Sequence, residues 1–318
     1  MNSSSVAGIP PVKASAFTAV QGGGTWRMVA AMALSGTIGL VVIESGLPVE
    51  HVVLLRCLLG ALGLGLWILW QRAWVPPSRS GWLSMVLGGA ALVANWVALF
   101  HAYAYVGIAV ATVVYHVQPF MLVLAAALGG EAIGWRKLLW MLPALCGVVL
   151  SSGLGTDAVA SLAPSTSAPV WGIALALLAA ALYTATVIST RRVKNIVPAQ
   201  IAMVQMLAGG AALACWSAPA LLQAMRHSTG LPGASTVVCV LILGLLHTAW
   251  MYGLMYGAFQ RLSAPAVAML SFIYPAVALA VDLLWFGTHP TVPQWLGMGT
   301  IVLAVLGYRW QDLRPQAA

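Results

Sequence analysis

Residues 102–125, "AYAYVGIAVATVVYHVQPFMLVLA", decide the fold because their pattern returns at residues 258–281 as "AFQRLSAPAVAMLSFIYPAVALAV". Each copy has a short break, a segment rich in Ala and Val, one or two polar or aromatic residues, and then a proline. Pro119 aligns with Pro275 in this comparison. The stretch therefore predicts a chain built from two related halves, each with an interrupted apolar helix.

The composition places the chain in a membrane. Of its 318 residues, 61% are hydrophobic and only 6% are charged, and the mean hydropathy is +0.95. Soluble domains carry about 25% charged residues. So few charges would leave most of the apolar surface of a soluble fold uncovered. We therefore expect an all-α membrane protein.

Ten segments have the length that a membrane-spanning helix needs, which is about 20 apolar residues. The third and fourth are separated only by Tyr105–Gly107, where we expect a tight turn. The ten predicted spans are residues 27–45, 51–71, 81–105, 108–130, 137–155, 170–189, 198–220, 235–260, 264–286 and 293–311.

The basic residues support this count and predict an orientation. With both termini in the cytoplasm, 12 of the 14 Lys and Arg residues fall in inner segments, as the positive-inside rule requires. Arg226 falls in an outer loop and Arg56 falls within the second span. The net charge of +8 is thus a topology signal, which needs no nucleic-acid partner. The expected location is the bacterial inner membrane.

The two halves predict an inverted repeat, because five spans per half turn the second half over. We expect a disordered cytoplasmic tail at 1–25, a first repeat at 26–155, an outer linker at 156–169, a second repeat at 170–311 and a cytoplasmic tail at 312–318. Inverted repeats recur in transporters, where the substrate site lies near the midplane between the halves.

Several stretches give the chain a family resemblance. They include "GLPVEHVVLLRCLLGAL" (46–62), "LLAAALYTATVISTRR" (177–192) and the two broken segments already quoted. The chain resembles the drug/metabolite transporter superfamily in its ten-helix EamA-type form, and its overall look is closest to bacterial aromatic amino acid exporters. The first half has the "GE" pair that such halves carry, at Gly130-Glu131, whereas the second has Gly287-Thr288. The role of Glu131 is therefore not duplicated.

Polar side chains at membrane depth are site candidates, since they are expensive in lipid and usually face a protein interior or a wet cavity. Tyr115 and Gln118 share a helical face, and His116 points about 100° away. The predicted cavity residues are Asn95, Trp96, Tyr115, Gln118, His247, Ser271 and Tyr274. A second set, nearer the span ends or on other faces, is His101, Tyr103, His116, Tyr183, Trp250 and Asp282. Interhelical hydrogen bonding is the alternative role for all of them.

Charges and prolines inside the spans suggest moving parts. Glu44 and Arg56 both lie toward the outer side, where a pair between them would act as a structural clamp or outer gate; a substrate role for Arg56 is the alternative. Pro119 and Pro275 each remove one backbone hydrogen bond, so each is a candidate hinge. A static kink is the other explanation, since proline is common in membrane helices.

These features predict a carrier that works by alternating access. The pathway candidates are mostly neutral and aromatic, which favours a small neutral or aromatic amino acid or a related metabolite over a phosphorylated one; export follows from the resemblance alone. No carboxylate lies clearly at the midplane and no phosphate-binding loop is present, so we expect facilitated movement. A proton-coupled multidrug or metabolite exporter of the same superfamily is the alternative.

Other classes and partners are disfavoured. The His residues are scattered over separate spans without metal or nucleophile spacing, so neither an enzyme nor a metal or cofactor is expected. The four cysteines fall in apolar segments, and we expect them to be small buried hydrophobes. The expected partners are a small-molecule substrate and the lipid bilayer, and the simplest assembly is a monomer.

Overall fold

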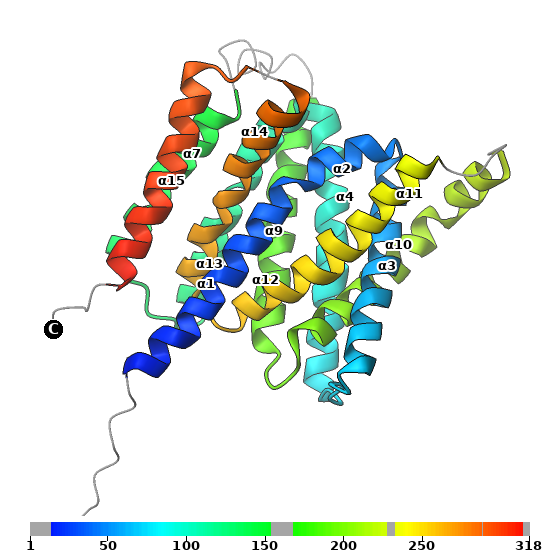
Figure 1. The fold of residues 1–318 in the computed structure, drawn as a ribbon, viewed down its shortest axis with the longest axis horizontal. Helices are drawn as coiled ribbons and strands as arrows, with labels where there is room; N and C mark the ends of the chain where they lie inside the picture. The colour runs from blue at the N-terminus through cyan, green and yellow to red at the C-terminus, as the bar shows by residue number, and fades with distance from the viewer. Residues whose placement is uncertain (1–13, 154–167, 228–232, 288, 314–318) are drawn as a thin grey trace, which may run out of the picture.

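The computed structural model describes residues 14–153, 168–227, 233–287 and 289–313, and within these ranges the regular structure is helical, with no strand (Figure 1). In these described ranges, eight helical segments are long and apolar enough to cross a membrane. A shorter apolar helix accompanies them at Met141–Ser151. The prediction of an all-α membrane protein is confirmed.

The first half begins earlier than expected and contains more breaks. Its first helix begins at Ala14, inside the predicted tail, because the small-residue stretch before Gly22 also has good helix formers. The helices of this half are α1 (Ala14–Gly36), α2 (Ile38–Ser45), α3 (Val49–Trp70), α4 (Arg79–Tyr115), α5 (Gln118–Leu128), α6 (Trp135–Leu139) and α7 (Met141–Ser151).

The second half contains a π-helix in the middle of its third span. In a π-helix each hydrogen bond reaches back five residues, which rotates the following side chains relative to α-helical spacing. The elements are α9 (Ala168–Arg192), α10 (Pro198–His227), α11 (Ala234–Leu241), the π-helix η1 (Ile242–Trp250), α12 (Met251–Phe259), α13 (Ala264–Ser271), α14 (Ile273–Phe286) and α15 (Val292–Leu313).

Helix α4 turns back on itself, as the predicted tight turn at residues 105–107 requires. Its hydrogen-bonding pattern is helical throughout, yet Asn95 Nδ2 lies 3.3 Å from Tyr115 OH. Two residues 20 positions apart would be about 30 Å apart on a straight helix. The chain therefore reverses between them, and the two membrane-length segments of α4 and α5 are Arg79–Val106 and Val110–Leu128.

Both predicted proline sites coincide with helix breaks. Helix α4 ends at Tyr115 and α5 begins at Gln118, while α13 ends at Ser271 and α14 begins at Ile273. A proline ring clashes with the carbonyl four residues earlier. For Pro119 that residue is Tyr115, and for Pro275 it is Ser271, so each break falls where its proline dictates.

The halves pack against each other along several helices. Helix α4 lies against α9, α3 against α10, and α1 against α12 and α14. Helix α15 runs beside α7 (Figure 1), where the backbones of Gly147 and Gly297 are so close that a Cβ on either would meet the other's carbonyl oxygen at 2.6–2.7 Å. The residues of the fifth predicted span form the two short helices α6 and α7, and those of the tenth form α15; neither is among the eight membrane-length segments found in the described residues.

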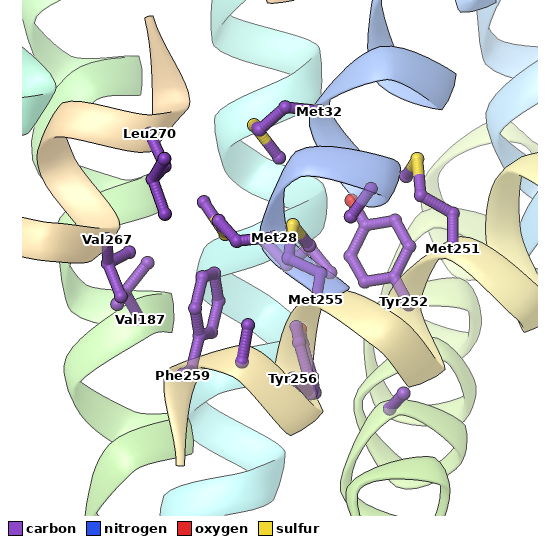
Figure 2. Close-up of a cluster of buried hydrophobic side chains, with 14 of the residues drawn as sticks. Met28, Met32, Val187, Met251, Tyr252, Met255, Tyr256, Phe259, Val267 and Leu270 are labelled. Atoms are coloured by element: carbon purple, nitrogen blue, oxygen red, sulfur yellow. The ribbon is translucent and has the colours of Figure 1, made fainter. Parts of the chain in front are cut away.

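The buried core is rich in methionine and aromatic residues. Figure 2 shows Met28 and Met32 of α1 beside Met251, Tyr252 and Met255 from the start of α12. Thioether side chains are flexible and fill irregular gaps. The expectation that all four cysteines are buried is wrong for two of them, because a membrane helix also has a face that the rest of the bundle does not cover. Cys57 and Cys239 are buried, and Cys146 and Cys215 are exposed.

The two ends of the bundle differ in charge. The turns that follow α3, α9 and α12 lie toward the lower side of Figure 1. We call the side formed by these turns, and by the turn after α5, the basic end. It carries Arg72, Arg79, Arg136, Arg191, Arg192, Lys194 and Arg261.

Candidate substrate site

The two helix breaks meet in the interior. The His116 ring from the first break stacks on the Tyr274 ring just after the second, with centroids 5.2 Å apart and an interplanar angle of 21°. Phe272, in the second break, lies 5.9 Å from the same imidazole. His116 is buried, and its Nδ1 lies 2.6 Å from the Thr112 carbonyl oxygen. The α4–α5 break thus turns His116 toward the second half. Helical spacing had predicted that His116 lies on a different face from Tyr115 and Gln118.

Beside this stack lies a polar cluster around Asn95. Its Nδ2 donates to the Ala179 carbonyl at 2.7 Å as well as to Tyr115, whose ring centroid is 6.2 Å from that of Tyr183. Asn95 is 1% exposed, and its Oδ1 has no hydrogen-bond partner among the described residues. Gln118 is also buried, with its backbone carbonyl accepting a long bond of 3.5 Å from Thr184.

Arg56 and Glu44 do not form the expected pair. Arg56 is 4% exposed; its Nε donates to Thr248 Oγ1 at 3.2 Å and its guanidinium lies 4.8 Å from the Trp96 ring centre. Glu44 instead accepts from Trp285 Nε1 at 3.1 Å on the surface. The pairing fails because α2 is a separate helix after the break at Thr37, and Glu44 faces α14.

A second buried histidine lies next to Thr248. The Nε2 of His247 is 2.7 Å from Thr37 Oγ1, and its Nδ1 has no hydrogen-bond partner among the described residues. His247 is 2% exposed. This contact links η1 to the break between α1 and α2. The predicted interior position of His247 is therefore found in the structure.

Some predicted site residues lie elsewhere. Trp250 is 62% exposed, because the π-helical turn rotates it outward and brings Thr248 and Tyr252 inward in its place. His101 is exposed near the end of its span. Ser271 donates to its own helix, to Ala268 O at 2.6 Å.

Two other members of the second predicted set are Tyr103 and Asp282. Tyr103 is half-buried beside Phe100, with ring centroids 5.9 Å apart. The side chain of Asp282 lies outside the described part of the structure. Tyr103 packs together with Tyr115 against Ala98, Leu99 and Ala179, so it lies next to the interior cluster.

Glu131, the acid of the "GE" pair in the first half, contacts the second half at the basic end. Its Oε2 lies 3.0 Å from Arg191 Nη2, and its Oε1 accepts the Ala264 N–H at the start of α13 at 2.9 Å. Arg191 also reaches the Leu262 carbonyl at 3.4 Å. We call Glu131, Arg191, Leu262 and Ala264 the clasp. The clasp was not predicted from the sequence, although a single acid, Glu131, close to several basic residues could have indicated an ion pair.

The basic end also carries crowded cations. Arg261 precedes the clasp residue Leu262, and its Nη1 donates to the Gly257 carbonyl at 2.7 Å. Partial burial, and then the nearby charge of Arg27, lower the pKa of Arg261. Glu131 therefore lies at an end of the bundle where several cations gather.

Open grooves lie away from these residues. Two shallow apolar grooves occur on the described surface, one between α4 and α10 and one between α3 and α10. Neither is lined by a predicted site residue. Of the predicted residues, Asn95, Trp96, Gln118 and His247 are buried, so this conformation shields them, whereas Trp250 and His101 are exposed.

Comparisons with known proteins agree with this architecture. The EamA-like transporter family matches residues 24–153 and again residues 170–310, so the chain belongs to this family of the drug/metabolite transporter superfamily. A protein from Bacillus subtilis (strain 168) named "Uncharacterized transporter YxxF" is 27% identical over 278 residues, which are 86% of this chain and 85% of that protein. One solved crystal structure aligns with a TM-score of 0.73 at 19% identity, covering 92% of this chain and 99% of its own. That structure supports the fold alone.

Proposed function

We propose that the protein is a carrier that moves small neutral or aromatic amino acids and related metabolites out of the cell by alternating access. Its membership in a transporter family supports the general class. The observation that carries the mechanism is the stack of His116 on Tyr274, which couples the two broken helices at one point. The substrate class is supported by the neutral and aromatic side chains around that point and by the sequence resemblance to aromatic amino acid exporters.

The topology proposed is ten spans in two inverted five-span repeats, with both termini in the cytoplasm of a bacterial inner membrane. The repeats would be residues 26–155 and 170–311, so that α6–α7 and α15 complete the count of ten. The two separate family matches and the twin helix breaks support this arrangement. By the positive-inside rule, the basic end would then face the cytoplasm.

The clasp would be the cytoplasmic gate of this carrier. It joins the α5–α6 turn of the first half to α9 and α13 of the second. When the halves rock, a contact between them at one end must break to open that end. A partly exposed ion pair with a helix-end hydrogen bond is weak enough to open and reclose. Breaks at Pro119 and Pro275 would let the half-helices α5 and α14 move.

Transport of amino acids by purified protein in liposomes tests the proposal. Counterflow of labelled Phe, Tyr, Trp and Leu should saturate and should not depend on a pH gradient. Because a carrier exchanges substrate across the membrane, unlabelled substrate inside the vesicle should accelerate entry. If none of the amino acids undergoes counterflow, the substrate class is wrong. If entry rises linearly with concentration, the carrier mechanism is wrong.

A proton-coupled exporter is the second candidate, favoured by the two buried histidines at the interior contacts. His116 touches Tyr274, and His247 touches Thr37. Protonation of either would place a charge where neutral groups now pack. The gradient arm of the same experiment separates the two candidates. Strict dependence on the pH gradient, abolished in His116→Phe or His247→Gln, would replace facilitated movement by proton coupling.

A further inference from the structure

Arg56 is the unusual charge of the membrane interior. It lies about 10 Å from the start of the membrane-length helix α3 and is 4% exposed. Its contacts are neutral, namely the Thr248 hydroxyl and the face of Trp96. Among the described residues, no carboxylate lies within ion-pair distance of it. Within the described part of the chain, Arg56 is thus a buried cation without a counter-ion.

Such a cation is costly unless something compensates it. A buried charge destabilises a protein unless it is paired and hydrogen-bonded, and inside a membrane the cost is greater. One hydroxyl and one aromatic face stabilise the guanidinium without neutralising its charge. An interior arginine without an acid therefore has unused binding capacity for an anion.

The geometry of the Arg56 guanidinium indicates which kind of anion it can bind. Thr248 occupies Nε, and neither Nη1 nor Nη2 has a hydrogen-bond partner among the described residues. Two parallel N–H donors match the two oxygens of a carboxylate. A phosphate would call for further cations, and no other Arg or Lys is buried in the described interior.

The surroundings fit the rest of an amphipathic organic acid. Trp96 meets the edge of Tyr252 at a centroid distance of 6.1 Å, and flexible Met251 precedes Tyr252. These side chains suit an apolar or aromatic group. Asn95, the neighbour of Trp96, has a buried Oδ1 without a hydrogen-bond partner among the described residues, and that acceptor suits an N–H donor such as an ammonium.

From these contacts we infer that Arg56 binds the carboxylate of the transported molecule, so that the substrate is a small organic acid or amino acid with an apolar side chain. Trp96 and Tyr252 contact the apolar part, and Asn95 accepts from an amino group where the substrate has one. Transport of this ligand rests on the proposed function above. Binding rests only on the geometry around Arg56.

Matched acids and amides test the binding. The full-length chain in detergent is titrated with 3-phenylpropanoate, L-phenylalanine and L-leucine, and with the amide of each, and the shift in thermal midpoint and the quenching of tryptophan fluorescence are measured. Each acid should bind at least about tenfold more tightly than its amide, since charge-assisted bidentate hydrogen bonds are lost in the amide.

Variants locate the preference. In Arg56→Gln the ratio of acid to amide affinity should fall to about one, and Arg56→Lys should retain part of it because the charge remains. The matched control is Arg192→Gln, which removes an exposed arginine at the basic end and should keep the full ratio.

Three results would overturn the inference. They are a ratio near one in the unmodified protein, no binding by any of the acids, or a full ratio in folded Arg56→Gln. The first two need no variant, so a misfolded substitution leaves the test intact. A protein that prefers acids but shows no counterflow would support the inference and refute the transport proposal. Counterflow without a preference for acids would refute the inference alone.

Discussion

Two arginines of this protein occupy contrasting environments. Arg191, at the basic end, is partly exposed and pairs with Glu131 at 3.0 Å. Arg56, within α3, is almost fully buried, and its partners among the described side chains are the neutral Thr248 and Trp96. Across the residues that the structure describes, the arginine that water could screen has a counter-ion, and the arginine inside the bundle has none.

The contrast teaches that position in the bundle separates structure from binding. Arg191 connects segments from both halves, so its acid partner makes it a closable contact. Arg56 lies about 10 Å into the membrane-length helix α3 and has no acid partner among the described residues. The ion pair of Arg191 therefore holds segments of the protein together, whereas Arg56 can pair with the acid of a ligand.

The largest effect on transport should come from replacing Arg56, the arginine that has no acid partner among the described residues. In Arg56→Gln, amino acid counterflow should fall by about 100-fold, because truncating one partner of a buried charged contact is severe. Thermal stability without ligand should stay equal or rise, since a bare buried charge has been removed. Transport in liposomes and the thermal midpoint in detergent are measured on the same preparations.

The opposite stability result would break the comparison. If Arg56→Gln unfolds at a much lower temperature, Arg56 is structural, as Arg191 is expected to be. The companion variant is Arg191→Gln, which leaves Glu131 without its cation and should lower the thermal midpoint by a few degrees. A larger loss in Arg56→Gln than in Arg191→Gln would reverse the assignment.

The next effect concerns the clasp. Glu131→Gln keeps an acceptor for Ala264 N–H but removes the ion pair, so the basic end should open more often. In a cysteine-free background, Ala268→Cys places a thiol in α13, which is buried from Ala264 to Leu270. We expect its labelling by a maleimide to be about three- to tenfold faster when Glu131 is replaced.

A matched ion pair controls this experiment. Arg309 and Asp312 pair at 3.5 Å within a single helix, α15. Arg309→Gln should leave the labelling of Ala268→Cys unchanged. Equal acceleration in both variants would mean that any charge change loosens the bundle, and the clasp would lose its role as a gate.

A smaller effect should follow from crowding the contact beside Arg56. An added Cβ at Gly60 would overlap the Thr248 side chain, which must move away from Arg56 Nε. Gly60→Ala should weaken acid binding by about three- to tenfold, the loss of one hydrogen bond to a charged group. The control is Gly63→Ala on the same helix, where a Cβ would meet Leu245 and Ala249 instead. Equal weakening by both would point to helix packing.

The smallest effect should come from the aromatic face. In Trp96→Phe the ring under the guanidinium becomes a weaker cation–π partner, while the apolar contact with Tyr252 persists. Acid affinity should fall by about two- to fivefold, and the affinity of the amides should hardly change. An equal fall for acids and amides would assign Trp96 to the apolar part of the site alone.

Prediction from sequence succeeded best for features that a local rule controls. The breaks at Pro119 and Pro275 follow from the geometry of proline, and the turn within α4 follows from the length of a span. It failed where helical spacing was extrapolated through irregular backbone. His116 gained its contact with Tyr274 because the break reorients it, and Trp250 faces outward because η1 is π-helical.

The sequence by itself determined the membrane class, the breaks and which residues are polar inside the spans, because composition and local backbone chemistry act within one segment. Only the tertiary structure decided which of these residues meet. Arg56 contacts Thr248 and Trp96 instead of Glu44, and Glu131 pairs with Arg191. Such partners lie tens to hundreds of residues apart, and their pairing depends on how whole helices pack and rotate, which no single segment encodes.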